Sequence, residues 1–208
     1  MGTTVNNIHV WASRLGGDPQ RVVANALAEP AFVTPAAAGW VSVFPESEDF
    51  RDRSARALSD LLGVACVNFF CFDSDAAHAS LIVDARVVDE ISVSWPSEYD
   101  DLEFEGMEEL PASEPPRAES PVLEGLSDNM EARGDLARWA EVLGVGSPDD
   151  ALAAARTQRD SPFAESVATR LLATFGLRED RLLMAYRFYE RGEESADAAS
   201  FLRTPLAQ

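Results

Sequence analysis

Residues 64–95 form the longest run of β-branched and aromatic side chains, and this run is broken only at turn-like positions. Both alternating sets of residues 64–72 are apolar, which is typical of a central strand covered on both faces. The polar corner at 73–75 favours a turn, so residues 79–84, which include Leu81, Ile82 and Val83, complete a hairpin with the first strand. We therefore expect Phe69, in the middle of the first strand, to be buried.

The third part of this run alternates between apolar and polar positions, as a strand with one solvent-exposed face does. The apolar set is Ile91, Val93 and Trp95, and the polar set is Glu90, Ser92 and Ser94. The three strands are predicted to form a meander, with the third strand nearer the edge of the sheet.

Two strands and two helices are expected before the meander. Residues 8–12 and 40–44 have the alternation of short strands. Asp18, followed by proline, is a typical helix N-cap, and Ser47 is the expected N-cap of the second helix. The predicted buried stripe of the second helix consists of Phe50, Ala57, Leu58, Leu61 and Leu62.

The C-terminal third has helical periodicity. Three helices are expected: one over 136–143, whose apolar residues are three and four apart and which ends at Gly144, one after Ser147 and one after Ser161. Residues 181–189 are ambiguous, since their apolar positions alternate while their composition also suits a helix. We favour a strand that returns to the main sheet.

This order of elements predicts an α/β or α+β fold, in which helices pack on a mixed β-sheet and a helical C-terminal region follows. The first two strands are expected to be joined by crossover connections. The predicted parts are an α/β sheet domain at 1–96, an acidic, proline-rich linker or long loop at 97–131, and a helical region at 132–208.

Composition adds a strong charge to this picture. The 208 residues include 36 acidic and 17 basic side chains, which gives a net charge of -19. Such a charge repels nucleic acid and anionic membrane surfaces and favours basic partners. The sequence shows neither a secretory signal pattern nor an apolar run of membrane-spanning length, so a cytoplasmic protein is expected.

Motifs for catalysis or for cofactors are lacking. The two histidines, His9 and His78, are too few for a multi-histidine metal site. Cys66 and Cys71 lie five apart, unlike the spacing of zinc or redox sites, and they should be buried, reduced thiols on opposite faces of one strand. Cys71 could form a Cys–His pair with His78 across the hairpin, but its apolar neighbours favour a neutral core thiol. No catalytic residue, metal or cofactor is therefore expected.

Between residues 96 and 131 the chain carries twelve acidic residues and one arginine. A solvated linker explains this composition. The aromatic residues interleaved with the carboxylates instead favour an interface, because an acidic strip with apolar anchors can dock on a basic groove. The predicted interface residues are Trp95, Glu98, Tyr99, Asp100, Asp101, Glu103, Phe104, Glu105, Glu108 and Glu109.

Two functions from different classes are consistent with these patterns. The first is a non-catalytic acidic binding protein, such as an immunity protein or inhibitor that neutralises a basic, toxin-like protein domain. The second is a small hydrolase or transferase whose site no motif reveals. One-sided charge without a catalytic constellation favours the first.

Overall fold

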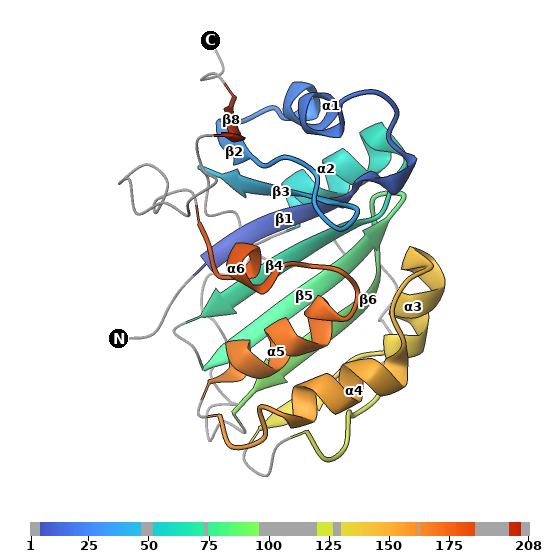
Figure 1. Cartoon of the computed structure of the whole chain (residues 1–208), viewed down its shortest axis with the longest axis vertical. Coiled ribbons are helices and arrows are strands. Elements are labelled where there is room, and N and C mark those ends of the chain that lie inside the picture. Colours follow the sequence, from blue (N-terminus) through green and yellow to red (C-terminus); the bar gives the residue numbers. More distant parts are fainter. Residues whose placement is uncertain are drawn as a thin grey trace, which may run out of the picture.

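The computed structural model describes residues 5–46, 52–72, 75–95, 120–126, 130–161, 163–185 and 200–204. These residues form one eight-stranded sheet with helices on both faces (Figure 1). The strands are β1 (Val5–Trp11), β2 (Ala31–Val33), β3 (Trp40–Pro45), β4 (Cys66–Phe72), β5 (Ala76–Val83), β6 (Arg86–Ser94), β7 (Glu131–Arg133) and β8 (Leu202–Arg203). The helices are α1 (Pro19–Ala26), α2 (Arg53–Leu62), α3 (Leu136–Leu143), α4 (Pro148–Arg156), α5 (Ala164–Ala173) and α6 (Glu179–Leu182), with a short 3-10 turn at Ala12–Arg14.

The strand order is β7-β6-β5-β4-β1-β3-β2-β8, and every described pair of neighbours is antiparallel. Because β3 lies between β1 and β2, these two strands run parallel without touching, joined through α1. In the same way β1 separates β3 from β4, which are joined through α2. The first four strands thus have the split βαβ arrangement of ferredoxin-like folds, which β5, β6 and β7 extend beyond β4.

The predicted fold class is confirmed, since helices pack on a β-sheet and a helical region follows. The predicted crossovers are present. A mixed sheet would also contain parallel pairs of neighbouring strands, and this part of the prediction is wrong, because all the described neighbours are antiparallel. Each crossover skips one position in the sheet, and an antiparallel strand fills that position. The meander of β4, β5 and β6 is also confirmed, and β6 has β7 alone beyond it.

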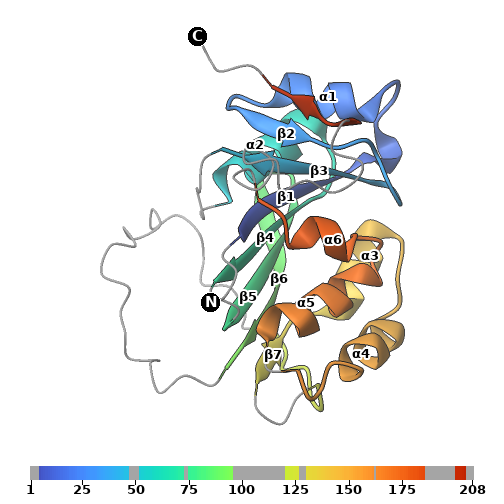
Figure 2. The same ribbon diagram turned by 60° about the vertical axis from the view of Figure 1, so that its left-hand side comes forward.

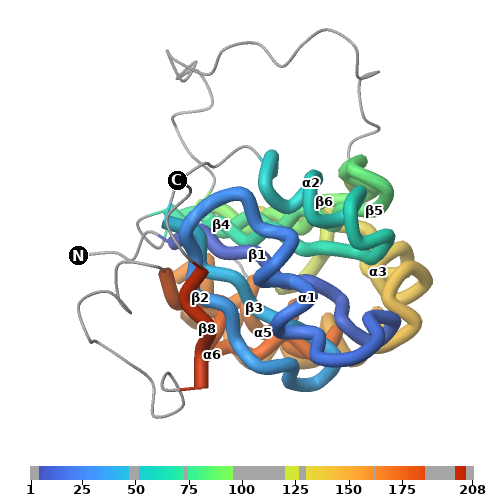
Figure 3. Tube along the Cα trace, turned by 90° about the horizontal axis from the view of Figure 1, so that it is seen from above, coloured from blue at the N-terminus to red at the C-terminus, as the bar shows by residue number. Residues whose placement is uncertain are grey.

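The sheet separates two hydrophobic clusters. On one face α1 and α2 cover β1, β3 and β4, and Val23 and Leu58 are among their buried side chains. On the other face α3, α4, α5 and α6 cover the sheet from β7 towards β1 (Figure 2). Viewed from above, α2 and α5 lie on opposite sides of the strands (Figure 3). The C-terminal helices therefore share a core with the meander.

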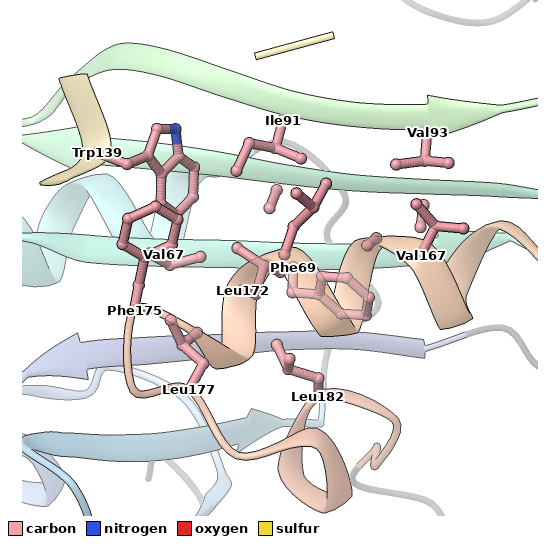
Figure 4. Close-up of a cluster of buried hydrophobic side chains, with 14 of the residues drawn as sticks. Val67, Phe69, Ile91, Val93, Trp139, Val167, Leu172, Phe175, Leu177 and Leu182 are labelled. Atoms are coloured by element: carbon pink, nitrogen blue, oxygen red, sulfur yellow. The ribbon is translucent and has the colours of Figure 1, made fainter. Parts of the chain in front are cut away.

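The two clusters together explain why β4 carries apolar side chains on both faces. Val67 and Phe69 point towards α5 and α6, and both are fully buried (Figure 4). Cys66 belongs to the cluster on the α2 face. The two cysteines are buried, free thiols on opposite faces, as expected.

Asp89 on β6 ties the helical region to the sheet edge. One of its carboxylate oxygens accepts hydrogen bonds from Trp139 Nε1 at 2.8 Å and from the backbone N–H of Asp135 at 2.9 Å. The other accepts one from Ser120 Oγ at 2.9 Å. Two of the three donors belong to the N-cap and first turns of α3, so this single side chain fixes the start of α3 against β6.

Two predicted elements need correction. The helix expected from Ser47 begins at Arg53, after Asp52, and Ser47 and Phe50 lie outside the described residues. Its buried side chains are Ala55, Leu58 and Ser59, whereas Leu61 is exposed. This stripe differs from the predicted one because Ala57 and Leu61 lie on the solvent side of the helix.

The strand predicted at 181–189 does not begin at Arg181, because Arg181 and Leu182 belong to α6. Residues 186–189 lie outside the described residues. A strand does return to the sheet from this part of the chain, but it is β8, beside β2. The division of the chain at residues 96 and 131 stays a prediction.

Candidate functional site

A buried polar cluster lies where β1 and β3 meet α6. The side chains of Asn7, His9 and Ser42 are all buried there. Asn7 Nδ2 donates to the backbone carbonyls of Leu182, at 2.7 Å, and Met184, at 2.9 Å. Since its amide nitrogen is the donor in both bonds, Asn7 Oδ1 faces His9 as an acceptor.

This network assigns the protonation state of His9. Its Nε2 lies 2.7 Å from Asn7 Oδ1 and therefore carries the proton. Its Nδ1 lies 3.0 Å from Ser42 Oγ and accepts the hydroxyl proton. Burial, reinforced by the positive charge of Arg181, lowers the pKa of His9 from 6.5 to about 3. A Ser–His–Asn chain can support acyl transfer when a substrate reaches the serine, but here all three side chains are enclosed, so we assign the cluster to stability.

His9 should make the protein less stable in mild acid. In the unfolded chain His9 binds a proton below its ordinary pKa of 6.5. In the folded chain the His9 side chain stays neutral until the pH falls to about 3. Between about pH 7.5 and about pH 5, His9 should therefore lower the free energy of unfolding by about 2 kcal/mol. Urea unfolding of the unmodified chain and of His9→Gln across this range checks the prediction. An identical pH dependence in both chains would contradict it.

A second polar cluster lies on the α2 face of the sheet, beyond the end of α2. We call it the polar face, and it consists of Asp52, Asn68, Phe70, His78, Ser80 and Glu90. Asn68, Ser80 and Glu90 lie directly opposite one another on β4, β5 and β6. Phe70 and His78 form the next row, and Asp52 stands at the N-terminus of α2 above Asn68.

Asp52 is the unusual member of the polar face. Its backbone lies in the left-handed region, at φ 56°, which is uncommon for a residue other than glycine. Its Oδ1 accepts a hydrogen bond from Asn68 Nδ2 at 2.7 Å. Burial raises the pKa of Asp52, and the negative charge of Glu90 adds to the rise, although the bonds from Asn68 and Ser80 and the nearby His78 oppose it. A carboxyl group is thus held in a place that disfavours its charge.

Ser80 links Asp52 to Glu90. Its hydroxyl donates to Glu90 Oε1 at 3.3 Å, and His78 Nε2 lies 3.2 Å from the same oxygen. Ser80 also hydrogen-bonds with Asp52. A hydroxyl has one proton, so Ser80 can donate to only one of the two carboxylates at a time, and its bond to Asp52 lowers the pKa of Asp52. The polar face therefore contains a chain of acid and base groups from Asp52 to His78.

Solvent reaches one end of this chain. The side chains of His78 and Glu90 are 41% and 30% exposed, whereas Ser80 is buried. Phe72, the next side chain on this face of β4, is exposed, and its ring lies 6.4 Å from that of Phe70. Partly buried carboxylates beside aromatic rings are suited to holding a cation or a hydrogen-bond donor of another molecule.

The predicted interface can be located at one residue. Trp95 directly follows β6 and is 36% exposed. Its backbone N–H donates to the carbonyl of Asp75 at 3.3 Å. The other nine predicted residues lie outside the described residues, and their role stays a prediction.

The Cys71–His78 pair does not form. Cys71 points towards α5, where its Sγ lies 4.0 Å from Glu165 Oε2, and His78 lies on the opposite face of the sheet. Burial raises the pKa of Cys66, which keeps that thiol neutral. Within the described ranges, His, Cys, Asp and Glu side chains form no group of three or more that is arranged to hold a metal ion.

Sequence reasoning missed the polar face because its members come from three strands and a helix start. The alternation on β6 did place Glu90 on a solvent side, and His78 and Ser80 alternate in the same way on β5. Pairing these two alternations in register would have brought the three side chains together. Nothing in the sequence indicates that Asp52 reaches them.

Among the described helices, none has the length and apolar character needed to cross a membrane. Comparisons of the chain with protein-family models, with curated proteins and with solved structures find no match.

Proposed function

We propose that this chain is a cytoplasmic, non-catalytic acidic binding protein of the immunity or inhibitor type, which neutralises a basic, toxin-like protein domain. The observation that supports this most is the polar face, where Asp52 and Glu90 are held in a partly buried, hydrogen-bonded arrangement next to Phe70 and Phe72. Basic side chains of a partner would complement this surface in charge.

The raised pKa of Asp52 supports a functional role for this carboxyl group. The folded chain binds its proton more tightly than the unfolded chain does, so at neutral pH the charged form costs stability. Asparagine would keep the acceptor for Asn68, would tolerate the left-handed backbone and would remove that cost. A carboxylate kept where a neutral residue is more stable indicates selection for something other than stability.

Net charge supports a basic partner. At -19, the chain attracts positively charged proteins over distances beyond contact, and this attraction accelerates association. The acidic residues after Trp95 would add to the same field, with Tyr99 and Phe104 as anchors that slow release. Both contributions predict an association rate that falls as ionic strength rises.

Association kinetics with a basic toxin domain encoded in a neighbouring reading frame test the proposal. We expect a rate that falls with salt and that falls again when Asp100, Asp101, Glu103 and Glu105 are changed to arginine. Asp52→Asn combined with Glu90→Gln should weaken the affinity by about tenfold or more, because charged hydrogen bonds to the partner are lost. Asp52→Asn alone should also raise the free energy of unfolding at neutral pH.

Glu141→Gln is the matched control, because Glu141 belongs to an exposed ion pair with Arg138 on α3, away from the polar face. It should leave the affinity unchanged. An association rate indifferent to salt and to all of these charge changes would contradict the proposal.

A small hydrolase or transferase is the second candidate, and the acid and base chain from Asp52 to His78 favours it. Its weakness is the nucleophile, since Ser80 is buried and donates directly to a carboxylate instead of to a histidine. Hydrolysis of ester and phosphodiester probes that is lost in Asp52→Asn and in His78→Gln, but retained in Glu141→Gln, would favour the enzyme over the binding protein.

A further inference from the structure

A short segment closes the sheet on its β2 side. Residues 200–204, which we call the strap, contain β8 and run antiparallel to β2 (Figure 1). The ladder pairs Phe32 with Arg203 and Val33 with Leu202. Two ladder residues give little stability by themselves, so the position of the strap depends on the contacts of its side chains.

Thr204 clamps one end of the strap. Its Oγ1 accepts a hydrogen bond from the backbone N–H of Ala31 at 2.7 Å and donates to the carbonyl of Glu29 at 3.0 Å. Its own N–H donates to the carbonyl of Ala31 at 2.9 Å. The threonine is buried, so one side chain and one amide satisfy three polar groups of the chain around β2.

Gln20 on α1 clamps the other end. Its amide nitrogen donates to the carbonyl of Val33 at 2.8 Å and to that of Ser200 at 2.9 Å. The two amide protons thus bridge the edge strand and the strap. This contact uses backbone atoms of the strap and therefore recognises an extended chain rather than a particular side chain.

The three side chains between the clamps each have a distinct contact. Phe201 stacks on Phe44 at 6.3 Å between ring centres, and the Arg181 guanidinium lies 4.4 Å from its ring centre. Leu202 packs with the cluster under α1, and the guanidinium of Arg203 lies over the ring of Phe32. The edge of β2 therefore contacts an aromatic, an aliphatic, an arginine and a threonine in that order.

We propose that the edge of β2 is a peptide-binding site for an extended segment of this pattern, and that its exchange partner is the strap of a second copy of the chain. Addition of a strand to a sheet edge, with pockets for successive side chains, is a common form of peptide recognition. An identical strap from a second copy reproduces every contact, so the exchange sacrifices none of them. The 14 residues between Ala185 and Ser200 can span up to roughly 46 Å, which is enough to reach a neighbouring molecule.

Charge determines when the exchange occurs. Each copy carries a net charge of -19, so two copies repel at low ionic strength. Salt screens this repulsion but leaves the hydrogen bonds and ring contacts of the strap largely intact. The exchanged dimer should increase with protein concentration and with salt, whereas association with a basic partner should weaken with salt.

The first test weakens the strap by substitution and measures whether the edge of β2 then binds a free peptide. In the full chain, Phe201→Ala with Thr204→Val weakens the strap without touching β2. A fluorescent peptide with the sequence of residues 199–205 should bind this variant saturably, and should bind the unmodified chain at least about tenfold more weakly, because the tethered strap competes at a high effective concentration. A peptide in which the phenylalanine and the threonine exchange places should not bind.

Thr204→Val alone provides a milder variant should the double one fail to fold, which circular dichroism would show. Equal binding of the two peptides, or no binding by a folded variant, would overturn the peptide site. Light scattering after size-exclusion chromatography tests the partner: a concentration- and salt-dependent dimer that is lost in Phe201→Ala/Thr204→Val supports exchange between copies, and a chain that stays monomeric throughout overturns it.

Discussion

Replacing Phe69 with alanine should lower the free energy of unfolding by about 3–5 kcal/mol. Phe69 is fully buried on β4, where its ring faces α5 and α6 (Figure 4). The substitution removes apolar contacts and leaves a cavity that the sheet and the helices cannot close, because both are fixed by neighbouring layers. Chemical denaturation monitored by tryptophan fluorescence measures the loss.

Phe72→Ala is the matched control, because it makes the same substitution three residues further along the strand. Phe72 lies on the opposite face and is 51% exposed, so its loss should change the free energy of unfolding by no more than about 0.5 kcal/mol. Equal effects of the two substitutions would show that β4 does not lie between two layers as described.

The burial of Phe69 was predictable from the sequence for a physical reason. A strand covered on both faces must be apolar at consecutive positions, and few other arrangements produce such a run in 64–72. The meander was predictable as well, because strands that are joined by short loops pair with each other as hairpins. Helix starts such as Asp18 were also predictable, since the capping side chain acts within one turn of its own position.

Strand neighbours that are distant in sequence were not predictable. The sequence indicates a crossover between two strands, but it does not indicate whether a third strand will lie between them, which is what β3 and β1 do. The strands β2, β7 and β8 have three, three and two residues, too few for an alternation to stand out. Their positions depend on side chains elsewhere, such as Gln20 for β8.

The polar face was unpredictable for a similar reason. Its central bond joins Asp52 to Asn68, sixteen residues apart and on different elements. A local pattern at Asp52 would favour an ordinary helix start, whereas the structure places its carboxyl group above a neighbouring strand. Long-range polar contacts of this kind leave no periodic signal, because each partner satisfies its own local pattern independently.

The local structure of residues 181–185 also depends on a side chain that is distant in sequence. Their alternation favours a strand, but Asn7 on β1 donates to the carbonyls of Leu182 and Met184, which holds this part of the chain as the end of α6. The last carbonyls of a helix need such partners when water cannot reach them. A side chain 175 residues away from Leu182 thus decides the local structure.

Asn7→Leu should therefore be strongly destabilising although the side chains have similar size. The carbonyls of Leu182 and Met184 and the Nε2–H of His9 would each lose a buried hydrogen bond, and each loss costs about 1–3 kcal/mol, so the free energy of unfolding should fall by roughly 3–9 kcal/mol. Ser42→Ala removes one bond from the same network and should cost about 1 kcal/mol. Hydrogen exchange at the amide of Leu182, which donates to the carbonyl of Arg178, should accelerate in Asn7→Leu far more than in Ser42→Ala. Were the two variants equally stable, the contacts between Asn7 and α6 would contribute nothing, and residues 181–185 would need another explanation for their helical end.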